Sequence, residues 1–108
     1  MKLTVRISTR AWRDADNIFR WLDARSHAGA SAWFEAFLSA SQSLANQFEA
    51  FGFAPEGEPI ERSIRHRFFK TRRGRIYRIL YLVEHDEVIV LRIRGPGQPP
   101  LTPDELIH

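Results

Sequence analysis

The sequence predicts an α+β domain: an N-terminal strand, a helical hairpin, then a three-stranded antiparallel meander, with the helices packed on one face of the sheet. Apolar residues recur at helical spacing over residues 9–51, in two stretches separated by a short break. They alternate at strand spacing over residues 3–7 and form strand-like runs from residue 61 onward. A chain of 108 residues supports one hydrophobic core, so we expect a single domain over residues 1–108.

The N-terminal half contains the first strand, over residues 3–7, and both helices. Ser8 or Thr9 can cap the first helix, which continues to about Ser26. Its apolar stripe consists of Trp12, Ala15, Ile18, Phe19 and Leu22. The segment around residues 26–29 breaks the pattern, and a second amphipathic helix follows. Its broad apolar face consists of Ala30, Trp33, Phe34, Phe37, Leu38, Ser41, Leu44, Ala45, Phe48 and Phe51.

The C-terminal half contains the meander. Glycine and proline make residues 52–59 a connecting loop, after which strands are expected over residues 61–70, 75–83 and 87–94. Strict alternation in the last strand would place Val88, Val90, Arg92 and Arg94 on one face, and Ile89, Leu91 and Ile93 on the other. The Gly/Pro-rich residues 95–100 end the sheet, and a terminal helical turn is expected after Thr102. We expect the sheet face opposite the helices to be open to a partner, and the first strand to lie at an edge.

Composition argues against a membrane protein and against chemistry that needs cysteine. The sequence has no apolar run of the roughly 18 to 20 residues that a membrane span needs, and its N-terminus lacks the apolar core of a secretion signal. We therefore expect a cytoplasmic protein without a membrane partner. The absence of cysteine excludes disulfides, a thiolate nucleophile and a cysteine-based zinc site. No metal or other cofactor is expected.

Charge is distributed unevenly along the chain. Residues 1–61 contain six Lys/Arg and eight Asp/Glu, whereas residues 62–108 contain ten and five. The cations cluster between Arg62 and Arg94, which fits an anionic partner such as a phosphate backbone, a ribosome surface or an acidic protein segment. A solvated surface that keeps the protein soluble is the alternative explanation. Both stay open, because several of these arginines fall inside predicted strands.

Four residues stand out against these patterns. Arg78 lies in the middle of a strand, so its guanidinium either reaches solvent at a cleft or pairs with Glu61 or another carboxylate. His66 lies inside a strand and His85 in a turn, and an imidazole can carry protons near neutrality, although a lone histidine is more often structural. Trp21 lies away from the apolar stripe of its helix, so we expect it to be exposed.

The order of elements resembles the RelE/ParE superfamily of bacterial toxins from type II toxin–antitoxin modules, of the plasmid-stabilisation type. The likeness is carried by Ala32-Trp33-Phe34 through Leu44 in the second helix, by residues 77–81, and by residues 86–91. The resemblance implies a small growth-inhibiting toxin neutralised by a cognate antitoxin and forming an oligomer through it. RelE-like members cut messenger RNA in the ribosome, whereas ParE-like members are reported to poison DNA gyrase without being nucleases.

The resemblance also implies functional residues. In a ribonuclease, Arg67, Lys70 and Arg78 would hold and polarise the phosphate, with His66 as proton carrier. Family nucleases often carry further basic residues and a tyrosine after the last strand, where this chain has Gly95-Pro96-Gly97-Gln98-Pro99-Pro100. This departure favours a ParE-like, non-enzymatic toxin over an endoribonuclease, and leaves open an inactive binding domain. The target-binding residues would be Arg65, Arg92, Arg94 and Gln98, and the antitoxin-binding residues Trp21, Arg78 and Arg94.

Overall fold

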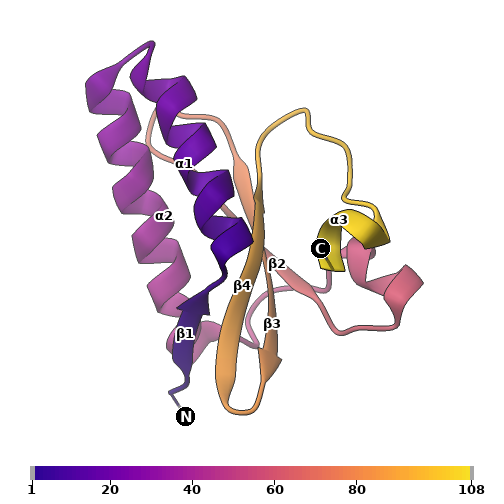
Figure 1. Ribbon diagram of the computed structural model, residues 1–108. Helices are drawn as coiled ribbons and strands as arrows, with labels where there is room; N and C mark the ends of the chain where they lie inside the picture. Colours follow the sequence, from indigo (N-terminus) through magenta and orange to yellow (C-terminus); the bar gives the residue numbers. More distant parts are fainter. Residues whose placement is uncertain (1, 108) are drawn as a thin grey trace.

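The computed structural model describes residues 2–107. The hairpin of α1 (Thr9–Asp23) and α2 (His27–Gln47) lies on one side of the sheet, and the 3-10 helix η1 (Pro55–Ile60) and the short α3 (Pro103–Ile107) lie on the other (Figure 1). The strands are β1 (Thr4–Ile7), β2 (Arg65–Phe69), β3 (Tyr77–Glu84) and β4 (Glu87–Arg94). The predicted α+β class and order of elements are confirmed.

Both long helices begin at serine caps. The Ser8 hydroxyl accepts the Ala11 N–H at 3.1 Å and donates to the Leu91 carbonyl at 3.0 Å, which fixes the start of α1 against β4. The Ser26 hydroxyl accepts the Gly29 N–H at 3.0 Å at the start of α2. A side-chain oxygen at this position satisfies an N–H group that has no partner within the helix. Of the two candidate caps for α1, Ser8 is therefore the one used.

The sheet has the strand order β1-β4-β3-β2. β2, β3 and β4 form the predicted antiparallel meander, and β1 pairs in parallel with β4, with Thr4 opposite Glu87 and Ile7 opposite Val90. The prediction that the first strand lies at an edge is confirmed. Beyond Ile7 the chain turns into α1, so residues 91–94 of β4 extend past the end of β1, and the edge of β4 there runs alongside α1.

The main core lies between the helical hairpin and the sheet. Trp33 stacks on Phe37 with ring centroids 5.6 Å apart and meets Tyr77 edge-on at 5.5 Å. Tyr81 is fully buried, and its hydroxyl donates to the Phe48 carbonyl at 2.7 Å. Burial raises the pKa of Tyr81 to about 12 despite the opposing charges of two nearby arginines. The strand face that carries these residues is thereby fixed against α2.

A second, smaller core lies on the opposite face of the sheet. Its buried members come from the loop before η1, the residue before β2, strand β3 and the C-terminal segment: Ala54, Ile64, Leu80, Leu101 and Leu106. The expectation that this face is open is therefore wrong where η1 and α3 lie. The physical reason is that this face of β3 and β4 also carries leucines, and covering apolar surface stabilises by roughly 25 cal/mol per Å².

A β-bulge in β4 reverses the expected alternation. Tyr81 pairs with Val90, but its neighbour Leu80 pairs with Arg92, so Leu91 is an extra residue in β4. Val90 therefore faces the main core, whereas Arg92 shares the opposite face with Leu80. The prediction that Val88, Val90, Arg92 and Arg94 share one face is wrong, because Arg94 likewise pairs with Arg78 beyond the bulge.

Candidate functional site

Arg78 lies on the sheet face opposite the helical hairpin and is bound by a buried carboxylate. Its two terminal nitrogens donate to Glu56 Oε1 at 2.8 Å and Oε2 at 2.5 Å. The side chain of Glu56 is fully buried, and that of Arg78 is 15% exposed. Glu56 Oε2 also accepts the Leu101 N–H at 3.4 Å. Of the alternatives for Arg78, the structure contains the ion pair, and its partner is Glu56 rather than Glu61.

His66 joins this pair. Its Nδ1 lies 3.2 Å from Arg78 Nη1, and because a guanidinium only donates, the ring nitrogen is the acceptor. Burial and the charge of Arg78 lower the pKa of His66 despite the opposing charge of Glu56. Burial also acts to raise the pKa of Glu56, but hydrogen bonds from Arg78 and from backbone N–H groups, with the Arg78 charge, outweigh it and lower that pKa overall. The cluster therefore favours a neutral imidazole beside an ionised pair.

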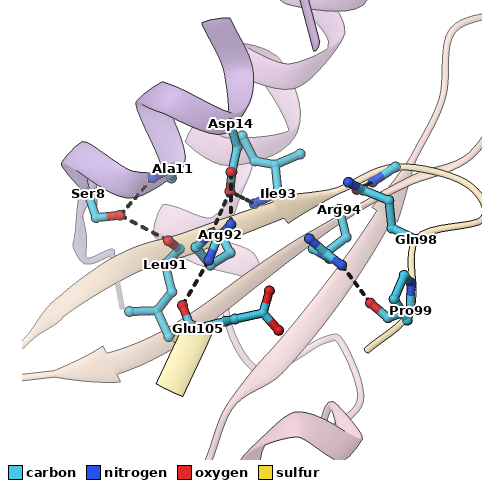
Figure 2. A network of polar contacts seen from close by, with 11 residues as sticks. Ser8, Ala11, Asp14, Leu91, Arg92, Ile93, Arg94, Gln98, Pro99 and Glu105 are labelled. Carbon is cyan, nitrogen blue, oxygen red and sulfur yellow. Dashed lines mark hydrogen bonds and ion pairs between the residues drawn. The ribbon is translucent and has the colours of Figure 1, made fainter. Parts of the chain in front are cut away.

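Arg92 connects three elements of the fold. Its Nε and Nη2 donate to the two carboxylate oxygens of Asp14 at 2.7 and 3.1 Å, and its Nη1 donates to the Glu105 carbonyl at 2.8 Å. Asp14 Oδ2 also accepts the Ile93 N–H at 2.9 Å, on the edge of β4 that β1 does not reach. Figure 2 shows Arg92 between Asp14 of α1 and Glu105 of α3. The side chain of Arg92 is only 9% exposed, so its main contacts lie within the protein.

Arg94 and Gln98 hold the segment that follows β4 (Figure 2). Arg94 donates to the Pro99 carbonyl at 2.6 Å, and Gln98 Oε1 accepts the Gly95 N–H at 2.5 Å. Burial and the charges of Arg92 and Arg78 lower the pKa of Arg94, partly offset by nearby carboxylates. Of the proposed target-binding residues, Arg92 and Arg94 are thus buried, whereas Gln98 is exposed.

Arg67 and Arg65 contact the helical side of the molecule. Arg67 pairs across the sheet with Ile79, which faces the main core, and donates to the Ala40 carbonyl at 2.8 Å and to the Ser43 hydroxyl. Burial lowers the pKa of Arg67. Arg65 donates to the Phe51 carbonyl at 2.5 Å and lies over the Phe53 ring at 4.2 Å.

The four residues proposed for phosphate cleavage therefore do not converge. His66 and Arg78 meet on one face of the sheet, and Arg67 lies on the other. Lys70 is exposed just past the end of β2. Their roles remain predictions.

A surface hollow of about 370 Å³ brings together residues from both halves of the sequence. Trp21 and Asn17 of α1 line it together with Arg75, Tyr77 and Gln98. The predicted exposure of Trp21 is confirmed at 54%. Arg75 was not among the site residues predicted from the sequence. The signal that was available is its place in the basic run of residues 70–75.

Within residues 2–107 no group of three or more His, Asp or Glu side chains is placed to hold a metal ion. No helix in the same range is long and apolar enough to cross a membrane. His85 lies exposed in the β3–β4 turn with a left-handed backbone at φ 52°.

Comparison with known proteins shows the family to which this chain belongs. The family model described as the ParE toxin of the type II toxin–antitoxin system parDE matches residues 5–98. Among solved structures, the RelBE2 toxin–antitoxin complex from Mycobacterium tuberculosis is similar, with 22% identity over 88% of this chain and 99% of that chain and a TM-score of 0.45. No curated protein matches. Because the family match covers most of the chain, the chain belongs to the ParE toxins of type II toxin–antitoxin systems.

Proposed function

We propose that this toxin arrests growth by binding its target rather than by cleaving RNA, with DNA gyrase as the candidate target. One observation carries the proposal: the arginines predicted to hold a scissile phosphate are already bound within the protein. Arg78 is paired with the buried Glu56, and Arg67 contacts α2 on the other face of the sheet. Stabilising a phosphoryl transition state requires cations that converge on one point, and this arrangement separates them.

A cognate antitoxin is the second partner in the proposal. The helical hairpin has an apolar surface hollow of about 340 Å³ lined by Trp12 and Phe19 of α1 and Phe34 of α2, and Trp12 is 42% exposed. Such a surface fits an apolar segment of a partner. Trp21 lies on the same helix and is still more exposed. We propose that the antitoxin covers the hairpin and Trp21, and that toxin and antitoxin assemble into an oligomer. Arg78 and Arg94 are largely buried on the opposite face of the sheet, so an antitoxin bound to the hairpin would not contact them directly.

An endoribonuclease remains the alternative because of one specific contact. His66 and Arg78 lie within hydrogen-bond distance of each other, and Arg94 pairs with Arg78 on the neighbouring strand. A proton carrier and two cations would face a substrate together if the C-terminal segment moved away from the sheet. In that case messenger RNA should be cut during growth arrest.

The experiment is induced expression in a bacterial host, with growth, transcript integrity and the DNA-damage response followed together. We expect arrest, intact transcripts and an induced damage response. Cleaved transcripts would favour the ribonuclease. Normal growth with soluble, folded protein would indicate a binding domain that has lost toxicity.

The role of Arg78 is tested with a paired variant. Arg78→Ala alone would leave Glu56 buried without a counter-charge, so loss of arrest could reflect misfolding. Arg78→Gln combined with Glu56→Gln removes both charges and keeps side chains that can hydrogen-bond. If the toxin acts by binding elsewhere, this double variant should still arrest growth. A folded double variant that no longer arrests growth would contradict a purely structural role for Arg78.

A further inference from the structure

Two turns that are far apart in the sequence meet at one end of the molecule. The α1–α2 turn contributes Arg25 and Ser26 and the start of α2 contributes Gly29 to a groove of about 200 Å³, and the β2–β3 turn contributes Arg73, Gly74 and Arg75. In Figure 1 both turns lie toward the upper end, away from the N-terminus. Three arginines thus line one groove, and they come from two separate elements.

These arginines differ from those inside the strands in having exposed side chains. The ion pairs found within residues 2–107 involve Arg6, Arg20, His27, Arg62, Arg78 and Arg92. None of these pairs includes Arg25, Arg73 or Arg75. The one carboxylate paired at the α1–α2 turn, Asp23, is bound to His27 at 2.6 Å. The groove therefore presents positive charge that the described part of the chain does not neutralise.

The exposed aromatic ring of Trp21 lies next to this basic groove. Arg75 lines both the groove and the neighbouring hollow that contains Trp21, so the two depressions adjoin. The guanidinium of Arg25 lies 3.6 Å from the centre of the Trp21 ring and donates to the Trp21 carbonyl at 2.7 Å. Asn17 and Gln98 add polar side chains to the rim of this hollow.

We infer that this end of the toxin binds a single strand of nucleic acid. Successive phosphates would lie along Arg25, Arg73 and Arg75, and one unpaired base would stack on the face of the Trp21 ring that the Arg25 guanidinium leaves uncovered. A basic groove beside an exposed aromatic ring is the arrangement used by proteins that bind single strands, because a phosphate needs a cation and an unpaired base needs a flat apolar partner. A duplex keeps its bases stacked on each other, so Trp21 would add nothing to duplex binding. Neither contact involves the sugar, so DNA and RNA strands should bind alike.

The inference goes beyond the proposed function, because it concerns binding of a nucleic-acid strand and not of the protein target or the antitoxin. It can therefore be tested on the purified chain alone. The measurement is fluorescence anisotropy of labelled homopolymer DNA and RNA strands of about 12 nucleotides, and of a DNA duplex of equal length. Salt is varied from about 50 to about 200 mM. Three phosphate contacts predict a slope of about −2 for the logarithm of the binding constant against that of the salt concentration.

Two double variants separate the groove from overall charge. Arg73→Glu with Arg75→Glu should weaken binding more than about tenfold and flatten the salt slope from about −2 to about −0.7, because one groove cation remains. Lys2→Glu with Arg13→Glu changes the formal net charge of +3 by the same amount, at exposed positions outside the groove. This control should retain nearly all of the affinity. An equal loss in both variants would show that binding follows bulk charge and would overturn the site.

Trp21→Ala tests the stacked base. It should weaken single-strand binding about tenfold and leave the salt slope unchanged, since stacking involves no counterion. Unchanged affinity would remove Trp21 from the site. Tighter binding of the duplex, or a strong preference for one sugar, would contradict the proposed set of contacts. No binding at the lowest salt concentration would overturn the inference as a whole.

Discussion

The strand arginines and the turn arginines form two groups with opposite surroundings. Arg78, Arg92 and Arg94 are almost buried, and each donates to a carboxylate or carbonyl within the protein. Arg73 and Arg75 are exposed at the end of the same sheet and have no ion pair within residues 2–107. All five belong to one basic stretch of sequence. Basic composition therefore indicates where cations are but not which of them are free to bind a partner.

The difference has a physical cause. A guanidinium inside a sheet loses water on folding, and the fold is stable only if a carboxylate or carbonyl replaces that water. A guanidinium in a hairpin turn stays hydrated and needs no partner. We therefore expect the strand arginines to act mainly on stability and the turn arginines mainly on binding. Four substitution experiments test this division, from the largest expected effect to the smallest.

Glu56→Ala should have the largest effect. It leaves Arg78 without its counter-charge beneath the C-terminal segment and removes the acceptor of the Leu101 N–H. Breaking a buried pair by removing one partner costs about 3 to 5 kcal/mol. Urea unfolding followed by circular dichroism measures the loss. Glu58→Ala, at an exposed position of η1, is the control and should change the free energy of unfolding by less than about 0.5 kcal/mol. Similar losses in both variants would contradict a special role for Glu56.

Asp14→Ala should cost about 2 to 3 kcal/mol, because it leaves Arg92 Nε and Nη2 and the Ile93 N–H without their acceptor, while Arg92 Nη1 keeps the Glu105 carbonyl. The same unfolding experiment measures it. Asp16→Ala removes only an exposed pair with Arg20 and should cost less than about 1 kcal/mol. If Asp14→Ala is no more costly than this control, the Arg92 network contributes little to stability.

Acidification should destabilise the protein through His66. Its pKa is lower in the folded state than the ordinary value of 6.5, so the unfolded chain binds the proton more readily. The stabilising contribution is therefore present above about pH 6.5 and is lost as the pH falls through the folded pKa. His66→Asn should flatten the dependence of unfolding free energy on pH between neutrality and pH 5. His85→Asn, at an exposed turn, should leave it as in the parent chain. The lowered pKa of Glu56 acts in the same direction at lower pH.

The smallest stability change is expected for Arg73→Ala combined with Arg75→Ala. Neither side chain has an ion pair in the described part of the chain, so the free energy of unfolding should stay within about 0.5 kcal/mol of the parent. Thermal unfolding by circular dichroism checks this. A loss of more than about 2 kcal/mol would remove the contrast between the two groups of arginines.

The sequence was sufficient to predict the strands, the two long helices and their order, because helical and strand periodicity were both clear, but it marked η1 (Pro55–Ile60) only as a loop. The details that determine the candidate site depended on contacts between distant residues. The partner of Arg78 is Glu56, 22 positions earlier, in a stretch that glycine and proline marked only as a loop. Leu101 and Leu106 lie in the C-terminal segment, beyond the expected strands, and they join Ala54, Ile64 and Leu80 in the second core. These apolar residues were the available sign that the far face of the sheet is covered.

The bulge at Leu91 could not be predicted from alternation, because inserting one residue leaves no composition signal in a strand rich in Val, Ile and Leu. It reverses the side to which Arg92 and Arg94 point, and so places them on the same face of the sheet as Arg78 instead of the face that carries the main core. The pattern predicted the strand correctly and its faces only as far as Val90.

The parallel pairing of β1 with β4 affects how the chain can fold during synthesis. Ser8 and the Leu91 carbonyl, which it contacts, are 83 positions apart, so the first strand has no partner until the last strand has been made. Contacts between such distant positions slow folding, because a long loop must close before they form. We expect that in an incomplete chain lacking β4 the first strand is not paired into the sheet and the helical hairpin is not packed against it. A premature stop codon anywhere before residue 87 should therefore yield a harmless, protease-sensitive fragment.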